Sequence, residues 1–127
     1  MEPMAKAAAG AQTSQSDWAA LKVMAGDGEL LFESAAAEKC AKVCQNTIDK
    51  VDDHIHEARQ LSRVEGFGSP IEGVQLAVKF RAKADEAVAV IQAHRQVLMD
   101  MRDTYRAAGK AYAETESANG AQYRANG

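Results

Sequence analysis

One stretch of this 127-residue chain gathers side chains that could hold a metal ion, the run Asp52-Asp53-His54-Ile55-His56-Glu57. On a helix, residues three or four apart share a face, whereas residues two apart do not. Only Asp53 with His56, or Asp53 with Glu57, could therefore meet one ion. Two ligands fall short of the three or four that zinc takes. We expect a solvated polar face here, with no metal site and no cofactor.

His94 stands in an otherwise apolar helical row. A partly buried, neutral, hydrogen-bonded imidazole is the usual state of such a residue. The alternative is a pH sensor, in which acidification below about pH 6 charges the ring and loosens the fold.

Cys40 and Cys44 lie four residues apart in a helical stretch, where an easy disulfide within the helix is not expected. Buried, inert thiols are the expected state of the pair. An interchain bridge or a reactive thiol are the alternatives.

The remaining chemistry-bearing residues are scattered along helices. No glycine-rich phosphate loop follows a strand, and no turn would expose a nucleophile, so no catalytic residue is predicted and the chain is not expected to be an enzyme. The net charge of −3, with Lys and Arg interleaved among acids, argues against a nucleic-acid partner. No window approaches the roughly 18 consecutive apolar residues of a membrane span.

Tyr112 and Glu116 form a Tyr-x-x-x-acid element near the end of the chain. In a helix the two side chains lie about one turn apart on one face, where a recognition partner could read both. The alternative for Tyr112 is a core position, because it closes an apolar row.

Two long segments must position these residues. Residues 29–65 are predicted as a first helix, with Asp27 as its cap, and residues 70–117 as a second helix. In both, apolar or small residues recur in steps of three and four, as in a helical seam. The first seam comprises Leu30, Ser34, Ala37, Ala41, Cys44, Ile48, Val51, Ile55, Ala58 and Ser62. The second comprises Ala77, Phe80, Ala84, Ala87, Ile91, His94, Leu98, Met101, Tyr105, Ala108 and Tyr112.

A turn at residues 65–69 separates the two helices, with Gly66, Phe67 and Gly68 at its centre. Ser69, Pro70 and Glu72 then form a capping box for the second helix. Residues 1–17 are predicted as a flexible leader, 18–28 as a short segment leading into the first helix, and 118–127 as a disordered tail.

The predicted fold class is all-α, an antiparallel two-helix hairpin. Folding the seams about the turn brings Cys44 near Ile91 and Ala37 near Leu98. Additional apolar rows flank the seams and widen the stripe beyond what one partner helix covers. We expect these flanking rows to form a partner interface and the chain to assemble as a four-helix bundle dimer. The predicted interface residues are Leu61, Leu76, Val90 and Val97. The alternative is that the rows are partly exposed, as Ala, Thr and single Val residues often are.

The predicted hairpin and the element Tyr112-Ala-Glu-Thr-Glu116 make residues 21–120 similar to a known family. They resemble the small Trp-x-Gly helical-hairpin proteins exported by type VII secretion, and the chain looks like a diverged actinobacterial member of that family. Asn119 and the Leu21-Lys-Val23 lead-in contribute to the likeness. The resemblance implies a folded homodimer or a heterodimer with a related hairpin protein. It also implies that the secretion ATPase recognises Tyr112 and Glu116 together with the turn of the partner. It implies a secreted or cell-surface location after synthesis in the cytoplasm.

The chain departs from that family at the turn. It has Gly66-Phe67-Gly68 where the family has Trp-x-Gly, and its one tryptophan is Trp18. Either Phe67 takes the place of the missing ring or a partner supplies it. A different class of function also fits the sequence: a cytosolic helical adaptor or chaperone-like module that grips a client helix and has no export role.

Overall fold

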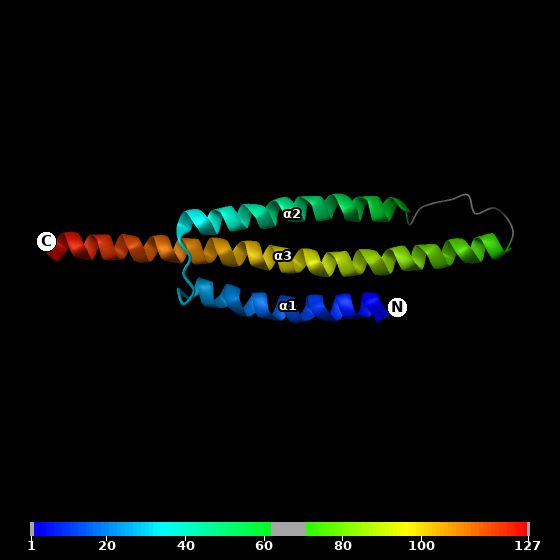
Figure 1. The fold of residues 1–127 in the computed structure, drawn as a ribbon, viewed down its shortest axis with the longest axis horizontal. Helices are drawn as coiled ribbons and strands as arrows, with labels where there is room; N and C mark the ends of the chain where they lie inside the picture. Colours follow the sequence, from blue (N-terminus) through cyan, green and yellow to red (C-terminus); the bar gives the residue numbers. More distant parts are fainter. Residues whose placement is uncertain (1, 62–70, 127) are drawn as a thin grey trace.

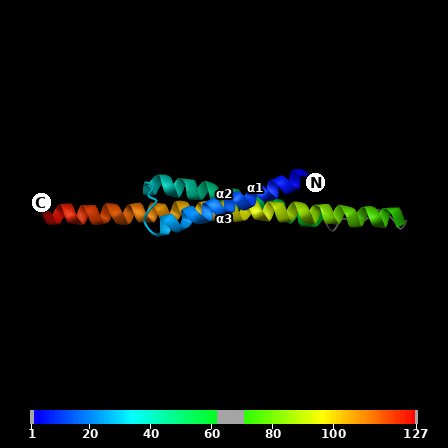
Figure 2. The same cartoon turned by 90° about the horizontal axis from the view of Figure 1, so that it is seen from below.

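The computed structural model describes residues 2–61 and 71–126, and this part of the chain forms three helices. They are α1 (Glu2–Gly26), α2 (Ser34–Leu61) and α3 (Ile71–Asn126). Helix α3 lies in the middle, with α1 and α2 along opposite sides of it (Figure 1). Both shorter helices pack on α3 and not on each other. Seen from below, the helices overlap over much of their length, so the three lie close to one layer (Figure 2).

The all-helical class agrees with the sequence, but the two-helix hairpin is wrong. Residues 2–26, expected as a flexible leader and a lead-in segment, form a helix of 25 residues that packs on α3. Its inner face repeats in steps of four and three, although most of its members are small: Ala7, Ala11, Ser14, Trp18, Leu21 and Ala25. Alanine has the highest helix propensity and lets two helices approach closely. The seam of α1 therefore needs few large side chains.

Helix α1 ends in a Schellman motif. Gly28 has φ of 79°, a left-handed conformation that glycine adopts without strain. The N–H of Gly28 donates to the carbonyl of Ala25 at 3.2 Å, and the N–H of Glu29 donates to the carbonyl of Met24 at 2.9 Å. Asp27, predicted as the cap of the following helix, belongs instead to this C-terminal cap.

Helix α2 begins at Ser34 and not at residue 29, because Glu33 serves as its N-cap. The Glu33 carboxylate accepts hydrogen bonds from the N–H groups of Ala36 at 2.8 Å and Ala35 at 3.1 Å. These two bonds, that of Ala36 first, hold the pKa of Glu33 below its usual value. The Ser34 hydroxyl donates elsewhere, to the carbonyl of Gly109 on α3 at 2.9 Å.

Three arginines of α3 reach acceptors on α2 and fix the antiparallel register. Arg95 meets Asp52 at 2.6 Å, Arg102 meets Gln45 at 2.8 Å, and Arg106 meets Glu38 at 3.9 Å. The three acceptors are spaced seven residues apart, so they share one edge of α2. Below this edge, the buried seam of α2 comprises Ala37, Ala41, Cys44, Ile48 and Ile55.

The predicted register of α2 against α3 is wrong by about three helical turns. Ala37 faces Gly109, where an added Cβ would lie 2.8 Å from the Cβ of Ala37, and not Leu98. Cys44 lies near Arg102 rather than Ile91. The prediction assumed that both helices start pairing at the turn, whereas α3 begins well before the point at which it meets α2 (Figure 1).

Helix α3 therefore extends past its neighbours at both ends (Figure 1). Since antiparallel helices advance together, the contact between Asp52 and Arg95 brings the end of α2 level with about residue 86. We call residues 71–86 the N-terminal overhang. At the other end, Gly26 and Ser34 line hollows together with residues of α3 between 105 and 114, and we call residues 112–126 the C-terminal overhang, with Tyr112 at its base. Helix α3 continues through residues 118–126, where a disordered tail was predicted.

The predicted turn residues Gly66, Phe67 and Gly68 lie outside the described residues, as do Ser69 and Pro70 of the predicted capping box. Within the described residues, no helix combines the length and the apolar character needed to cross a bilayer.

Candidate interaction site at the C-terminal end of α3

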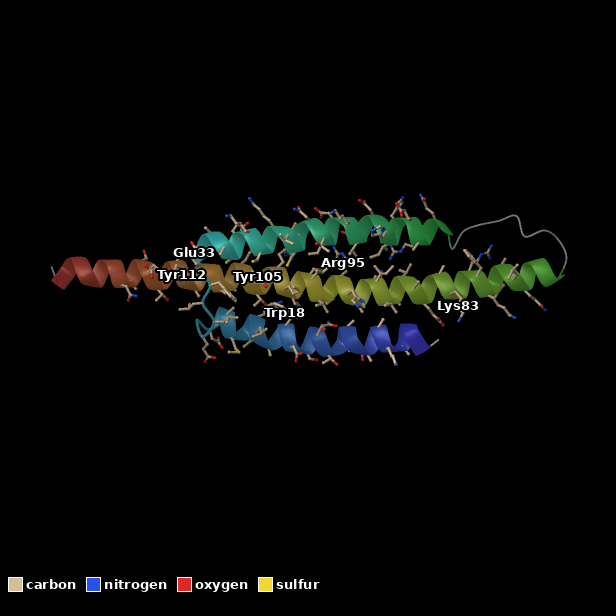
Figure 3. All side chains as sticks on the ribbon, viewed as in Figure 1. Trp18, Glu33, Lys83, Arg95, Tyr105 and Tyr112 are labelled. Carbon is tan, nitrogen blue, oxygen red and sulfur yellow. The ribbon has the colours of Figure 1, made fainter. Side chains whose placement is uncertain are left out.

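An aromatic cluster joins α1, α3 and the segment that connects α1 to α2. Tyr105 packs against Trp18 of α1 (Figure 3), and it also packs against Phe32 of the segment that connects α1 to α2. The ring centroids are 5.8 Å and 5.6 Å from that of Tyr105, with tilts of 51° and 53°. Such tilted pairs stabilise a contact beyond the area they bury. Burial raises the pKa of the Tyr105 phenol.

The connecting segment, residues 27–33, crosses α3 directly after this cluster. The N–H of Phe32 donates to the carbonyl of Ala108 at 3.3 Å, and the next contact is that of Ser34 with Gly109. Although the backbone is held against α3, Leu31 and Phe32 remain 42% and 41% exposed. The segment therefore presents large apolar side chains to solvent.

Tyr112 follows Ala108 by one helical turn and is half-buried at the base of the C-terminal overhang. Glu116, one further turn along the same face, is exposed. The neighbouring residues 113–119 are all exposed. The two residues of the predicted signal thus lie on one face of α3, where it leaves the other two helices.

Two hollows flank this part of α3. One, of about 340 Å³, lies between the end of α1 and α3 and includes Gly28, Lys110 and Glu114 in its lining. The other, of about 240 Å³, lies between the start of α2 and α3 and includes Ser34, Tyr105 and Gly109. The base of the C-terminal overhang is therefore indented on both sides.

His94 is exposed, so its interpretation as a buried residue is wrong. It lies beside α1 rather than in the α2 interface, in a hollow shared with Gly10, Ala11 and Ser14. Its Nδ1 lies 2.9 Å from the carbonyl of Val90, so Nδ1 carries a proton and donates to that oxygen.

The two cysteines differ, although both were expected to be buried. Cys44 faces α3 and is buried, whereas Cys40 is exposed; neither forms a disulfide. Burial, and secondarily the nearby Cys40, raises the pKa of the Cys44 thiol.

The run from Asp52 to Glu57 provides side chains for packing and for local contacts. Asp52 pairs with Arg95, His54 lies 3.8 Å from Glu57, and His56 lies 3.1 Å from Gln60. Throughout residues 2–61 and 71–126, no three His, Cys, Asp or Glu side chains gather as a metal site would require.

The predicted partner interface is divided by the fold. Val97 lines the hollow with α1, so this flank is covered by the chain itself. Val90 is half-buried, and Leu76 on the N-terminal overhang is 55% exposed. The side chain of Leu61 lies outside the described residues. Among the three predicted interface residues whose side chains are described, Leu76 alone is mostly exposed, so the three do not offer one exposed surface to a partner.

Sequence reasoning missed the α1 interface and its polar contact. Asp100 is buried on α3, 3.6 Å from Lys22 of α1, and accepts a hydrogen bond from Gln96 at 3.3 Å. The carbonyls of Asp100 and Trp18 both accept from the buried Thr104 hydroxyl, at 2.6 Å and 3.5 Å. The sequence pattern that could have predicted this interface is the heptad spacing of small residues before Trp18.

No protein-family model, no curated protein and no solved structure matches this chain.

Proposed function

We propose that this chain is exported by a type VII secretion system, as a substrate or co-secretion partner, and that the C-terminal overhang carries its export signal. The observation that supports this is the position of Tyr112 and Glu116. Both lie on one face of α3, with Tyr112 half-buried at the base of the overhang and Glu116 exposed within it. A receptor can enclose the exposed stretch from residue 113 to residue 119 and reach Tyr112 at its base.

The chemistry of the overhang suits recognition of a helix in a groove. Such recognition relies on side chains spaced by three or four residues along one helix face. Tyrosine is a frequent anchor because its ring buries a large area while its hydroxyl forms a hydrogen bond. Glu116 adds a charge that selects for a basic partner residue. The partner in this proposal is the secretion ATPase, and the final location is the cell surface or the medium.

The test is export of variants from a host with an active type VII system, measured as the ratio of protein in the medium to protein in the cells. Tyr112→Ala and Glu116→Gln are each expected to lower this ratio by about tenfold or more, the effect of losing a binding hot spot. Glu114→Gln is the matched control, because it removes the same charge from the opposite side of the helix. Helical content and thermal unfolding of each variant are measured in parallel.

Export of Tyr112→Ala at the wild-type level would overturn the proposal. An equal loss in Glu114→Gln would also count against it, because net charge alone would then explain the effect.

A second candidate function is a helical binding module that remains in the cell and grips a client. It is favoured by the N-terminal overhang, where Val74, Leu76 and Val78 are 53–58% exposed. Leu76 points away from Val74 and Val78, so a client would have to enclose the overhang. Under this function the wild-type chain stays in the cells and Tyr112→Ala changes nothing, whereas Leu76→Ser weakens client binding.

A further inference from the structure

We infer that the connecting segment between α1 and α2 belongs to the recognition surface of the C-terminal overhang. The composite surface consists of Leu31 and Phe32 together with Tyr112 and Glu116. Its partner is a protein with an apolar groove bordered by basic side chains. This inference rests on the export function proposed above and identifies what the receptor must offer.

The exposure of Leu31 and Phe32 is built into the fold. The segment is held at its start by the Schellman motif of Gly28 and at its end by the Glu33 cap. Between these points the Phe32 N–H is bound to the Ala108 carbonyl. A segment fixed in three places loses little conformational entropy on binding, so its exposed apolar area is available for affinity.

The two parts of the composite surface meet α3 about one helical turn apart. Phe32 contacts α3 at Tyr105 and Ala108, and Tyr112 comes one turn after Ala108. Exposed side chains of Leu31 and Phe32 therefore precede the half-buried ring of Tyr112, which is followed by Glu116. An apolar center with a charged border is the usual anatomy of a protein interface.

The charges around this surface indicate the chemistry of the partner. The segment Asp27–Glu33 contains three acids and no base, and all three acids are exposed: Asp27, Glu29 and Glu33. Glu116 adds a fourth. Two bases, Arg106 and Lys110, line the hollows that flank this part of α3, so the four acids outnumber them. Nucleic acid and anionic lipid would be repelled by such a surface. A second copy docking by the same surface would set these acids against each other, which costs affinity. An apolar groove bordered by basic side chains complements both the exposed apolar residues and the acidic residues of this surface.

The experiment compares export of Leu31→Ser with that of Val43→Ser. Val43 is 64% exposed on α2 and matches Leu31 in being a large, solvent-facing aliphatic residue. Phe32 is left intact because its ring packs on Tyr105. We expect Leu31→Ser to lower export by about tenfold, as for an interface anchor, and Val43→Ser to leave it unchanged. The unfolding temperature and the fluorescence of Trp18 are measured for both to verify the fold.

A charge variant tests the second half of the inference. Glu29→Lys is expected to lower export more than Glu29→Gln, because reversal adds repulsion from a basic border while neutralisation only removes attraction.

The outcomes separate this inference from the export function itself. If Tyr112→Ala blocks export while Leu31→Ser and Glu29→Lys do not, the composite surface is wrong and the export signal stands. If none of the three affects export, both are wrong. If Leu31→Ser instead halves the mass of the purified protein in sedimentation, the surface binds a second copy and the proposed partner is wrong.

Discussion

The two sides of α3 are built on different principles. On the α2 side, a buried aliphatic seam is bordered by three arginine contacts, and Gly109 allows the helices to approach closely. On the α1 side, the seam is mostly Ala and Ser, and the large contacts are concentrated at Trp18 and Leu21. The comparison shows that a long helix can be held by distributed packing on one flank and by a local clamp on the other.

Replacement of Trp18 should have the largest effect, because it removes the clamp of α1. Trp18→Ala is expected to destabilise α1 docking by about 2–3 kcal/mol, through lost area and the lost ring contact with Tyr105. Hydrogen exchange should show faster exchange in α1 while α2 and α3 keep their protection. Val23→Ala, at a site 63% exposed on the same helix, is the control. Equal loss of protection in all three helices would contradict the two-sided description.

A change at Gly109 tests the close packing on the other side. Gly109→Ala would place a Cβ 2.8 Å from that of Ala37, so α2 and α3 must separate. Overpacking of this kind costs about 1–3 kcal/mol, partly offset by about 1 kcal/mol of helix propensity. Gly120→Ala in the same helix meets no neighbour within 4 Å and is expected to stabilise slightly. Chemical denaturation measures both; a stabilised Gly109→Ala would show that the contact has room to adapt.

Exchanging the charges of one arginine pair tests whether the arginine contacts fix the register of α2 against α3. Asp52→Arg and Arg95→Asp should each cost up to about 1 kcal/mol, because the pair is partly exposed and screened by water. The double variant restores opposite charges and should recover most of the loss. A double-mutant cycle by urea denaturation provides the coupling energy. Additive losses would mean that this pair does not fix the register.

The smallest expected effect is a pH dependence at the start of α2. Because the folded pKa of Glu33 lies below its unfolded value, its contribution is present above the unfolded pKa and is lost as pH falls through the folded pKa. The difference in melting temperature between wild type and Glu33→Ala should therefore be present at pH 7 and shrink below about pH 4. A difference that stays constant down to pH 2.5 would rule out the carboxylate as the cap.

The difference between the α1 side and the α2 side of α3 also explains which helices could be predicted from the sequence. The seams of residues 34–61 and 71–112 contain Ile, Leu, Met and Tyr at helical spacing, so two helices and an all-α class follow directly. Helix α1 was missed because Ala7, Ala11 and Ser14 carry the same spacing without apolar bulk. Their contribution appears only when a partner surface is present.

Local sequence patterns also could not predict the register of α2 against α3 or the composite surface. The sequence places Tyr112 and Glu116 on one helix face, but Leu31 and Phe32 are about 80 positions earlier and reach that face only through the crossing at Ala108. The register depends on the length of the N-terminal overhang, which no local signal sets. A salt bridge between Arg95 and Asp52 would have predicted the correct register, but the predicted register was chosen from the apolar rows alone.

The unequal lengths of the helices also determine how the molecule would pass through a narrow opening. A single helix with its side chains is about 10–12 Å across, and three abreast span roughly 30 Å. A channel that fits one helix would admit the last part of the chain and stop where Ser34 and Gly109 meet. Further passage would require α1 to detach from α3 or the channel to widen. Under the proposed export, the width of the channel would therefore decide whether the protein is exported in its folded state.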